Sequence, residues 1–163
     1  TQNLPNSQLD RFLMKLSMGY PDVDSQVRIL RERSQQEPLE QVEPVMRREE
    51  LLTAIAKVRQ VHVDDQIYDY IARLAEVTRT HPLLKLGISP RGALALCRTA
   101  KARAFAEGRD FVVPEDVTQM AEYVFAHRLM LSSKARLNEY TPEAIVAEVL
   151  AQTQPPVLSE RRA

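Results

Sequence analysis

The tripeptide Ser89-Pro90-Arg91 lies where an apolar run that ends in glycine gives way to a stretch rich in Ala and Leu. Ser is a good N-cap and Pro a good first residue, so a helix is predicted to begin here with Arg91 in its first turn. A cation is normally unfavourable there, because the peptide dipoles leave positive partial charge at a helix N-terminus. An anion bound by both the free N–H groups and the guanidinium would remove this objection, and a guanidinium suits phosphate oxygens. On residue chemistry alone the alternative stays open, namely an exposed arginine paired with a local carboxylate.

A second arginine, Arg11, lies in the sequence LDRF at the end of a short predicted helix. Leu9 and Phe12 are expected to anchor this segment while Asp10 and Arg11 point to solvent. An arginine near a helix C-terminus is favoured by the helix dipole, so a purely local role is equally compatible with this position.

Motifs of self-contained enzymes are missing from the sequence. It has no phosphate loop of the form G-x-x-x-x-G-K-[ST], and no G-x-G-x-x-G, H-E-x-x-H, C-x-x-C or G-x-S-x-G. His62, His81 and His127 are scattered without metal-ligand spacing and are expected to be ordinary surface or half-buried residues. The sequence therefore predicts no metal site.

The overall composition narrows the class of protein. The 163 residues include 22 Lys plus Arg and 22 Asp plus Glu, so no basic excess exists for nucleic-acid binding. The single cysteine, Cys97, cannot form an intrachain disulfide, which fits a reducing cytoplasm. No apolar run approaches the roughly 20 residues of a membrane-spanning helix, and no membrane association is expected. The chain does not begin with Met, which indicates a piece of a longer protein.

Few glycines and long uninterrupted runs predict a mostly helical fold. Periodicity and capping residues predict helices over 6–12, 22–34, 48–61, 64–79, 90–107, 114–126 and 141–152. Residues 12–18 (FLMKLSM) alternate weakly, as in a strand, and the apolar triplets 111–113 and 129–131 could pair as a two-stranded ribbon. Two helices are expected to turn specific apolar residues inward, namely Leu51, Leu52, Ile55 and Val58 in one and Leu94, Leu96, Cys97, Ala100 and Ala104 in the other.

Taken together, these stretches resemble MoxR-type AAA+ proteins. LPNSQLDRFLMKLSMGYP is similar to the end of their ATPase core, and LGISPRGALALCRTAKARAFAEGRDFVVPEDV to their second sensor helix and the segment after it. YTPEAIVAEVLAQTQPP resembles their C-terminal segment. The resemblance implies an all-α helical-bundle lid domain over residues 20–156. It also implies a strand-like remnant of the α/β core over residues 1–19 and a disordered tail over 157–163.

The resemblance also implies roles for individual residues. Arg91 is expected to contact the phosphates of ATP from the lid, as the second sensor. Arg11 is expected to act as an arginine finger toward the nucleotide of the adjacent subunit. Gly87, Ser89 and Pro90 would bring the backbone close to the nucleotide. Thr1-Gln2-Asn3 looks like the polar first-sensor motif, although the family has a longer stretch after it.

For the whole protein the resemblance implies a homo-oligomeric ring, typically a hexamer, that uses ATP and Mg²⁺ to remodel or mature other proteins. Some such partners carry von Willebrand factor A domains. A hinge between core and lid is expected near Gly19-Tyr20-Pro21. Because the phosphate loop and the acidic metal-binding motif are missing here, this chain alone is not expected to hydrolyse or retain ATP. Two alternatives remain, a stand-alone helical interaction module and the lid of a magnesium-chelatase-like subunit, although EGRDFVVPEDV fits the MoxR pattern better.

Overall fold

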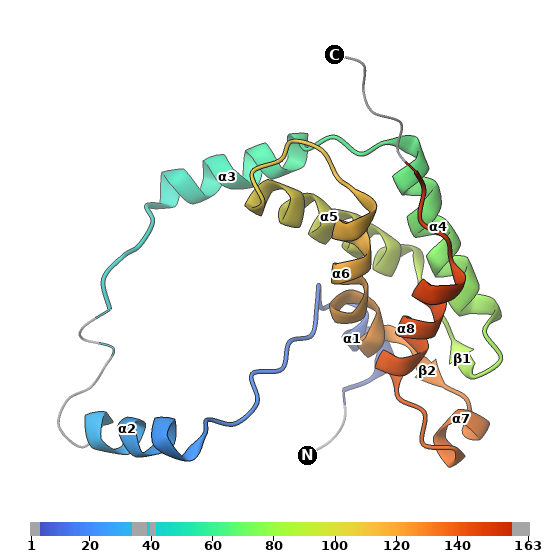
Figure 1. Cartoon of the computed structure of the whole chain (residues 1–163), viewed down its shortest axis with the longest axis horizontal. Coiled ribbons are helices and arrows are strands. Elements are labelled where there is room, and N and C mark those ends of the chain that lie inside the picture. Colours follow the sequence, from blue (N-terminus) through green and yellow to red (C-terminus); the bar gives the residue numbers. More distant parts are fainter. Residues whose placement is uncertain (1–3, 34–38, 40–41, 158–163) are drawn as a thin grey trace. The chain divides into compact units, whose positions relative to one another are not determined.

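The computed structural model describes residues 4–33, 39 and 42–157. The first-sensor resemblance of residues 1–3 and the predicted tail after Val157 lie outside these residues. The chain divides into two compact units, Thr1–Lys15 with Ala56–Ala163, and Leu16–Ile55. Figure 1 gives the order of their elements along the chain.

The first unit is a helical bundle with one apolar core. Helices α4 (Asp65–Thr80), α5 (Pro90–Ala106), α6 (Pro114–Phe125) and α8 (Pro142–Gln152) pack on one another, as Figure 1 shows. Their ends follow the local sequence, since the Asp64 carboxylate accepts from the Gln66 N–H at 2.9 Å and the Thr141 hydroxyl from the Ala144 N–H at 3.1 Å. The predicted all-α architecture is confirmed. The largest fully buried side chains include Ile67, Tyr70, Leu74, Ile88, Leu96, Phe125 and Ile145.

A two-stranded antiparallel ribbon is also present, but one of its strands differs from the prediction. Strand β1 (Leu84–Leu86) pairs with β2 (Met130–Leu131), so the ribbon and its second strand were expected and its first was not. Phe111 instead forms a parallel bridge with His62, whose N–H donates to Asp110 O at 2.7 Å. An apolar triplet indicates a short strand without specifying its partner, because tertiary packing decides which backbone lies beside it.

The N-terminal segment contains the short helix α1 (Asn6–Leu9). Residues 12–18, predicted to be strand-like, form no strand within the described part of the chain, which corrects that expectation. A strand needs a partner strand for its backbone groups, and here the Lys15 N–H donates instead to Tyr123 O on α6 at 2.9 Å.

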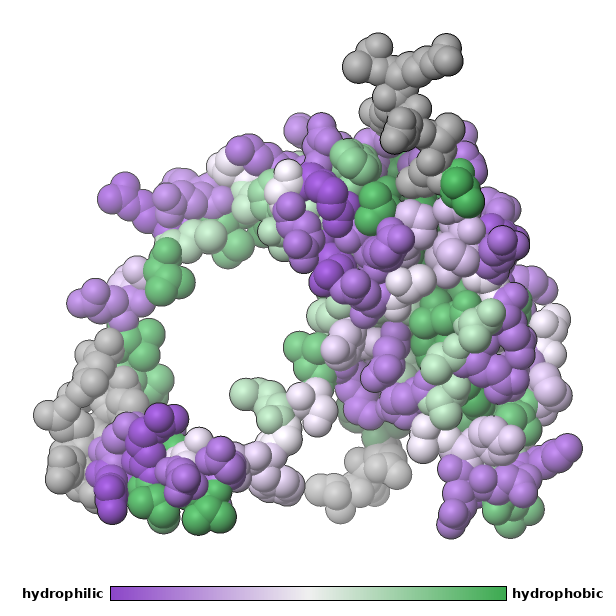
Figure 2. All heavy atoms as spheres, in the orientation of Figure 1, coloured by the Kyte–Doolittle hydropathy of each residue, from purple (hydrophilic) through white to green (hydrophobic). Residues whose placement is uncertain are grey.

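The second unit contains α2 (Val23–Arg33) and most of α3 (Arg48–Gln60), and neither helix has a buried residue. The prediction that Leu51, Leu52 and Ile55 face inward is therefore wrong, because all three are exposed. Figure 2 shows hydrophobic surface on both helices. In α5, Leu94 is exposed as well, although Leu96, Ala100 and Ala104 are buried as predicted.

The first unit also contains two short elements, the 3₁₀ turn η2 (Ala126–Arg128) and helix α7 (Ser133–Leu137). No helix in the described ranges combines the length and the hydropathy needed to cross a membrane.

Candidate anion-binding site

The start of α5 is built as the sequence predicts. Ser89 has extended backbone angles and its hydroxyl accepts from the Gly92 N–H at 3.2 Å, so it caps the helix. Pro90 is the first helical residue, where its missing N–H leaves no donor unpaired. Arg91 therefore occupies the first turn, and its side chain is exposed.

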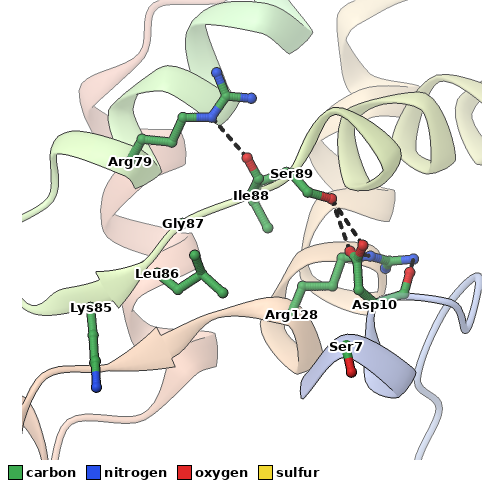
Figure 3. Close-up of a pocket in the computed structure, with 9 residues that line it drawn as sticks. All are labelled: Ser7, Asp10, Arg79, Lys85, Leu86, Gly87, Ile88, Ser89 and Arg128. Carbon is green, nitrogen blue, oxygen red and sulfur yellow. Dashed lines mark hydrogen bonds and ion pairs between the residues drawn. The ribbon is translucent and has the colours of Figure 1, made fainter. Parts of the chain in front are cut away.

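The chain before this helix is pinned to the end of α4. A Cβ on Gly87 would lie 2.6 Å from the Thr78 carbonyl and from the Arg79 nitrogen, so only glycine fits. The next residue, Ile88, is buried; its N–H donates to Thr78 Oγ1 at 2.9 Å and its carbonyl accepts from Arg79 Nε at 2.9 Å. Figure 3 shows the bond from Arg79 to the Ile88 carbonyl, next to Gly87. The close approach that Gly87 permits is thus toward α4, and its expected approach to a nucleotide stays a prediction.

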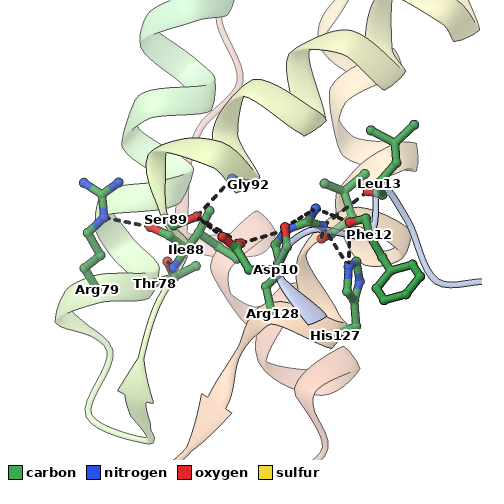
Figure 4. A network of polar contacts seen from close by, with 11 residues as sticks. Asp10, Phe12, Leu13, Thr78, Arg79, Ile88, Ser89, Gly92, His127 and Arg128 are labelled. Atoms are coloured by element: carbon green, nitrogen blue, oxygen red, sulfur yellow. Dashed lines mark hydrogen bonds and ion pairs between the residues drawn. The ribbon is translucent and has the colours of Figure 1, made fainter. Parts of the chain in front are cut away.

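Arg128, at the end of η2, ties residues 10–13 to the bundle (Figure 4). Its side chain is only 2% exposed, and its Nε donates to Asp10 Oδ1 at 3.2 Å. The same guanidinium donates to the carbonyls of Phe12 and Val124. Burial lowers the pKa of Arg128, while the Asp10 carboxylate raises it and the charge of Arg91 lowers it further. Arginine nevertheless remains protonated, so a buried cation holds this segment.

Asp10 consequently does not point to solvent, as the sequence led us to expect. Its two carboxylate oxygens accept from Ser89 Oγ at 3.0 and 3.1 Å, in addition to the bond from Arg128. Phe12, expected to anchor the segment, is exposed. The anchor is therefore polar, because a charge-assisted pair with a buried arginine outweighs one partly covered ring.

Arg11 and Arg91 line one cavity of about 430 Å³, together with Arg98 and Arg128. Asp10, which lines the same cavity, compensates the charge of Arg128. The remaining three arginines make no side-chain hydrogen bond or ion pair with the described residues. Three uncompensated guanidinium groups around one cavity favour a polyanion, because each offers a rigid fork of donors to oxygen.

A second cavity of about 480 Å³ adjoins the same anchor residues (Figure 3). Asp10, Ser89 and Arg128 line it together with the apolar Leu86 and Ile88. Apolar side chains line both cavities, since Leu13, Leu94 and Ala95 contribute to the arginine cavity. The cavities differ in their cations, because Arg79 and Lys85 line this one in place of Arg11, Arg91 and Arg98.

The described histidines and acidic residues are too scattered to hold a metal ion. Within the described ranges, no three His, Cys, Asp or Glu side chains are grouped so that they could hold a metal ion. His127 contacts Arg128 Nη1 through Nε2 at 2.9 Å, and burial together with that positive charge lowers its pKa.

Sequence reasoning missed two members of this site. Arg98 follows Arg91 by seven residues, about two helical turns, so helix periodicity would have placed both on one face of α5. Arg128 carries no comparable signal, because its partner Asp10 lies 118 residues away in the chain.

The fold and a family comparison together define the class of this protein. Residues 76–149 match the family model of the AAA lid domain. This segment contains the bundle helices α5 and α6, the end of α4, most of α8, and the Gly87–Arg91 turn. It is an AAA lid domain.

Similar proteins place the chain more narrowly. It is 31% identical over 156 residues to the chaperone MoxR1 of Mycobacterium tuberculosis, covering 90% of this chain and 41% of that protein. It is 40% identical over 157 residues to the uncharacterized protein YeaC of Bacillus subtilis strain 168, covering 96% and 49%. The crystal structure of a candidate ATPase from Cytophaga hutchinsonii superimposes with a TM-score of 0.86 at 28% identity, covering 96% of this chain and 50% of that one.

Over 90% of its length the chain is similar to proteins named MoxR, and the resemblance to MoxR-type AAA+ proteins inferred from its motifs is confirmed. It spans about half the length of the relatives it matches.

Proposed function

We propose that this chain is the lid of a MoxR-type ATPase and that its arginine cavity receives the phosphates of ATP. The observation that carries the proposal is that Arg11 and Arg91, which are 80 positions apart, line one cavity without a carboxylate partner. Phosphate oxygens supply the negative charge that this cavity lacks. In this role Arg91 contacts the nucleotide from the first turn of α5, and Ser89 and Pro90 fix that turn.

Arg11 can act in either of two arrangements. As an arginine finger it reaches the nucleotide of an adjacent subunit, which is the role that the family resemblance implies. The shared cavity favours a second arrangement, in which Arg11 and Arg91 of one chain contact the same nucleotide. In both arrangements the arginine stabilises negative charge that develops during phosphoryl transfer.

ATP fits the residues present here, whereas Mg²⁺ needs ligands from elsewhere, because the described residues contain no carboxylate cluster. When bound, ATP with Mg²⁺ supplies the phosphoryl group whose hydrolysis releases free energy. We propose that the ligands of Mg²⁺ belong to the ATPase core, and that this chain contributes arginine donors and a movable lid. The hinge would lie near Gly19, which has a positive φ of 64° and open space around it.

For the whole protein we propose a cytoplasmic homo-oligomeric ring, hexameric as in many AAA+ proteins, that remodels or matures other proteins. Support comes from the AAA lid match and from the relative named as a chaperone. Partners with von Willebrand factor A domains belong to the same proposal.

The test is an ATPase assay on the full-length protein that contains this chain. Arg91→Ala and Arg11→Ala are each expected to lower kcat by more than about tenfold, since an arginine at transferring phosphate commonly contributes about 10³ or more. Arg136→Ala serves as the control, because Arg136 is exposed on α7 and lies outside both cavities. Wild-type rates in both cavity variants would refute the site.

Mixing the two inactive variants decides between the arrangements. If Arg11 acts across a subunit interface, a mixed ring contains sites with an intact Arg91 facing an intact Arg11, and activity partly returns. If both arginines act on one nucleotide from the same chain, every site lacks one of them and mixing restores nothing.

A further inference from the structure

One carboxylate connects the two arginines of the proposed site. Asp10 immediately precedes Arg11, and it accepts from the hydroxyl of Ser89, two residues before Arg91. We propose that Asp10, Ser89 and Arg128 form a latch that sets the position of Arg11 relative to Arg91. This inference rests on the proposed function, and it concerns positioning residues that need not touch the nucleotide.

The Ser89 hydroxyl both accepts and donates a hydrogen bond, which fixes its orientation. Its oxygen accepts from the Gly92 N–H at 3.2 Å, while its hydrogen is donated to the Asp10 carboxylate at 3.0 Å. The cap that begins α5 and the bond that holds Asp10 therefore depend on one rotamer. Figure 4 shows both bonds of this hydroxyl. A shift of α5 at its first turn must therefore move Asp10 or break the bond to it.

Arg128 holds the other side of the same carboxylate and the backbone around it. Besides Asp10 Oδ1, it donates to the carbonyls of Asp10 and Leu13, each at 3.3 Å, and to that of Phe12. A planar guanidinium with five donors can serve several acceptors at once, which an ammonium group cannot do in the same geometry. The backbone on both sides of Arg11 is therefore fixed by a single buried side chain.

Apart from the latch, few contacts tie the residues around Arg11 to the bundle. The side chains of Arg11, Phe12 and Leu13 are all exposed. Other contacts to the bundle are the bond from the Lys15 N–H to Tyr123 O, the contact of His127 with Phe12 O at 3.2 Å, an exposed Lys15–Glu143 ion pair and the partly buried Met14. The N–H groups of Arg11 and Phe12 donate only to α1, to Gln8 O at 3.0 Å and Leu9 O at 3.1 Å. Loss of the latch is thus expected to free the segment 10–13 while the apolar core of the bundle stays intact.

The first test is hydrogen exchange of the full-length protein, which does not depend on catalysis. Asp10→Ala is expected to speed exchange of the amides of residues 11–15 by about tenfold or more, because their anchoring side chain is lost. Exchange within α4 and α8 should stay unchanged. Asp69→Ala is the matched control, because Asp69 forms an exposed ion pair with Arg73 on α4. Equal exchange of residues 11–15 in wild type and Asp10→Ala would overturn the latch.

The second test asks whether Asp10 acts through Arg11. Asp10→Ala is expected to lower kcat by about tenfold with a smaller change in KM, because a mispositioned arginine fails in the transition state. In an Arg11→Ala background the same substitution should change kcat by less than about threefold. A merely structural Asp10 would give the full effect in both backgrounds, and that result would refute the inference.

Conservative replacements keep the test informative if Asp10→Ala folds poorly. Ser89→Thr keeps the hydroxyl and should retain activity, whereas Ser89→Ala removes it and should lower kcat. Arg128→Lys keeps the charge but not the fork, and it should behave as Asp10→Ala does. The two proposals fail differently: wild-type activity of Arg11→Ala and Arg91→Ala refutes the nucleotide site, whereas activity loss in those variants with wild-type behaviour of Asp10→Ala refutes only the latch.

Discussion

Substituting Gly87 by alanine tests how the turn before α5 is held. The new Cβ would lie 2.6 Å from backbone atoms of Thr78 and Arg79, whereas ordinary contact begins at 3.4 Å. Neither backbone can yield easily, because both residues belong to α4, whose last turn is buried at Thr78. The turn must therefore retreat by about 0.8 Å, the difference between these two distances.

This retreat has a cost that can be estimated. It would stretch the bond from the Ile88 N–H to Thr78 Oγ1 from 2.9 Å to about 3.7 Å, beyond hydrogen-bonding distance. The loss of this bond and of the Arg79–Ile88 bond costs about 0.5–1.5 kcal/mol each. Overpacking adds about 1–3 kcal/mol. We expect Gly87→Ala to lower the free energy of unfolding by roughly 2–6 kcal/mol.

Urea unfolding of the chain, followed by circular dichroism, measures this change. Gly108→Ala is the matched control, because Gly108 has a φ of 76° with nothing within 4 Å of an added Cβ. That substitution loses only the free energy needed to hold an alanine at a left-handed φ, about 1 kcal/mol. If Gly87→Ala destabilised the chain no more than Gly108→Ala, the argument from close approach would be refuted.

Three further substitutions test other parts of the bundle by the same unfolding measurement. Tyr70→Phe should leave stability unchanged or raise it by up to about 1 kcal/mol, because the buried Tyr70 hydroxyl has no partner among the described residues; Tyr68→Phe, at an exposed ring, is the control, and a clear loss in Tyr70→Phe would contradict the reasoning. Asp116→Ala should cost about 3 kcal/mol, because Asp116 is 1% exposed and accepts from both terminal nitrogens of Arg109 at 2.8 and 2.6 Å; a change below about 1 kcal/mol would show that this pair contributes little. Burial lowers the pKa of His127 in the folded chain. As the pH decreases below about 6.5, the unfolded chain therefore takes up the proton before the folded chain does, and the free energy of unfolding decreases. The urea midpoint of wild type should therefore fall more between about pH 7 and about pH 5.5 than that of His127→Gln, and equal slopes would count against this prediction.

Much of the fold could be predicted from local sequence, because caps and periodicity act over one or two turns. Ser89 and Thr141 cap the helices that they were expected to cap. The periodicity of α3 also indicated an apolar face correctly, yet nothing in the described residues buries it. Periodicity identifies which side of a helix is apolar, whereas burial depends on what packs there, and that information is not local.

For the candidate site too, local features could be predicted from the sequence and long-range contacts could not. The position of Arg91 follows from its own helix, and its cavity could be anticipated from the unfavourable placement of a cation at a helix start. Which arginines remain available to a ligand could not be anticipated, because this depends on where each carboxylate lies in space. Asp10 was expected in solvent, but it compensates Arg128 across 118 positions and leaves Arg11 beside it uncompensated. Charge pairing between distant segments therefore decides the chemistry of this cavity. For that reason, substitution of Asp10, rather than of either proposed phosphate contact, most directly tests whether the two arginines act together.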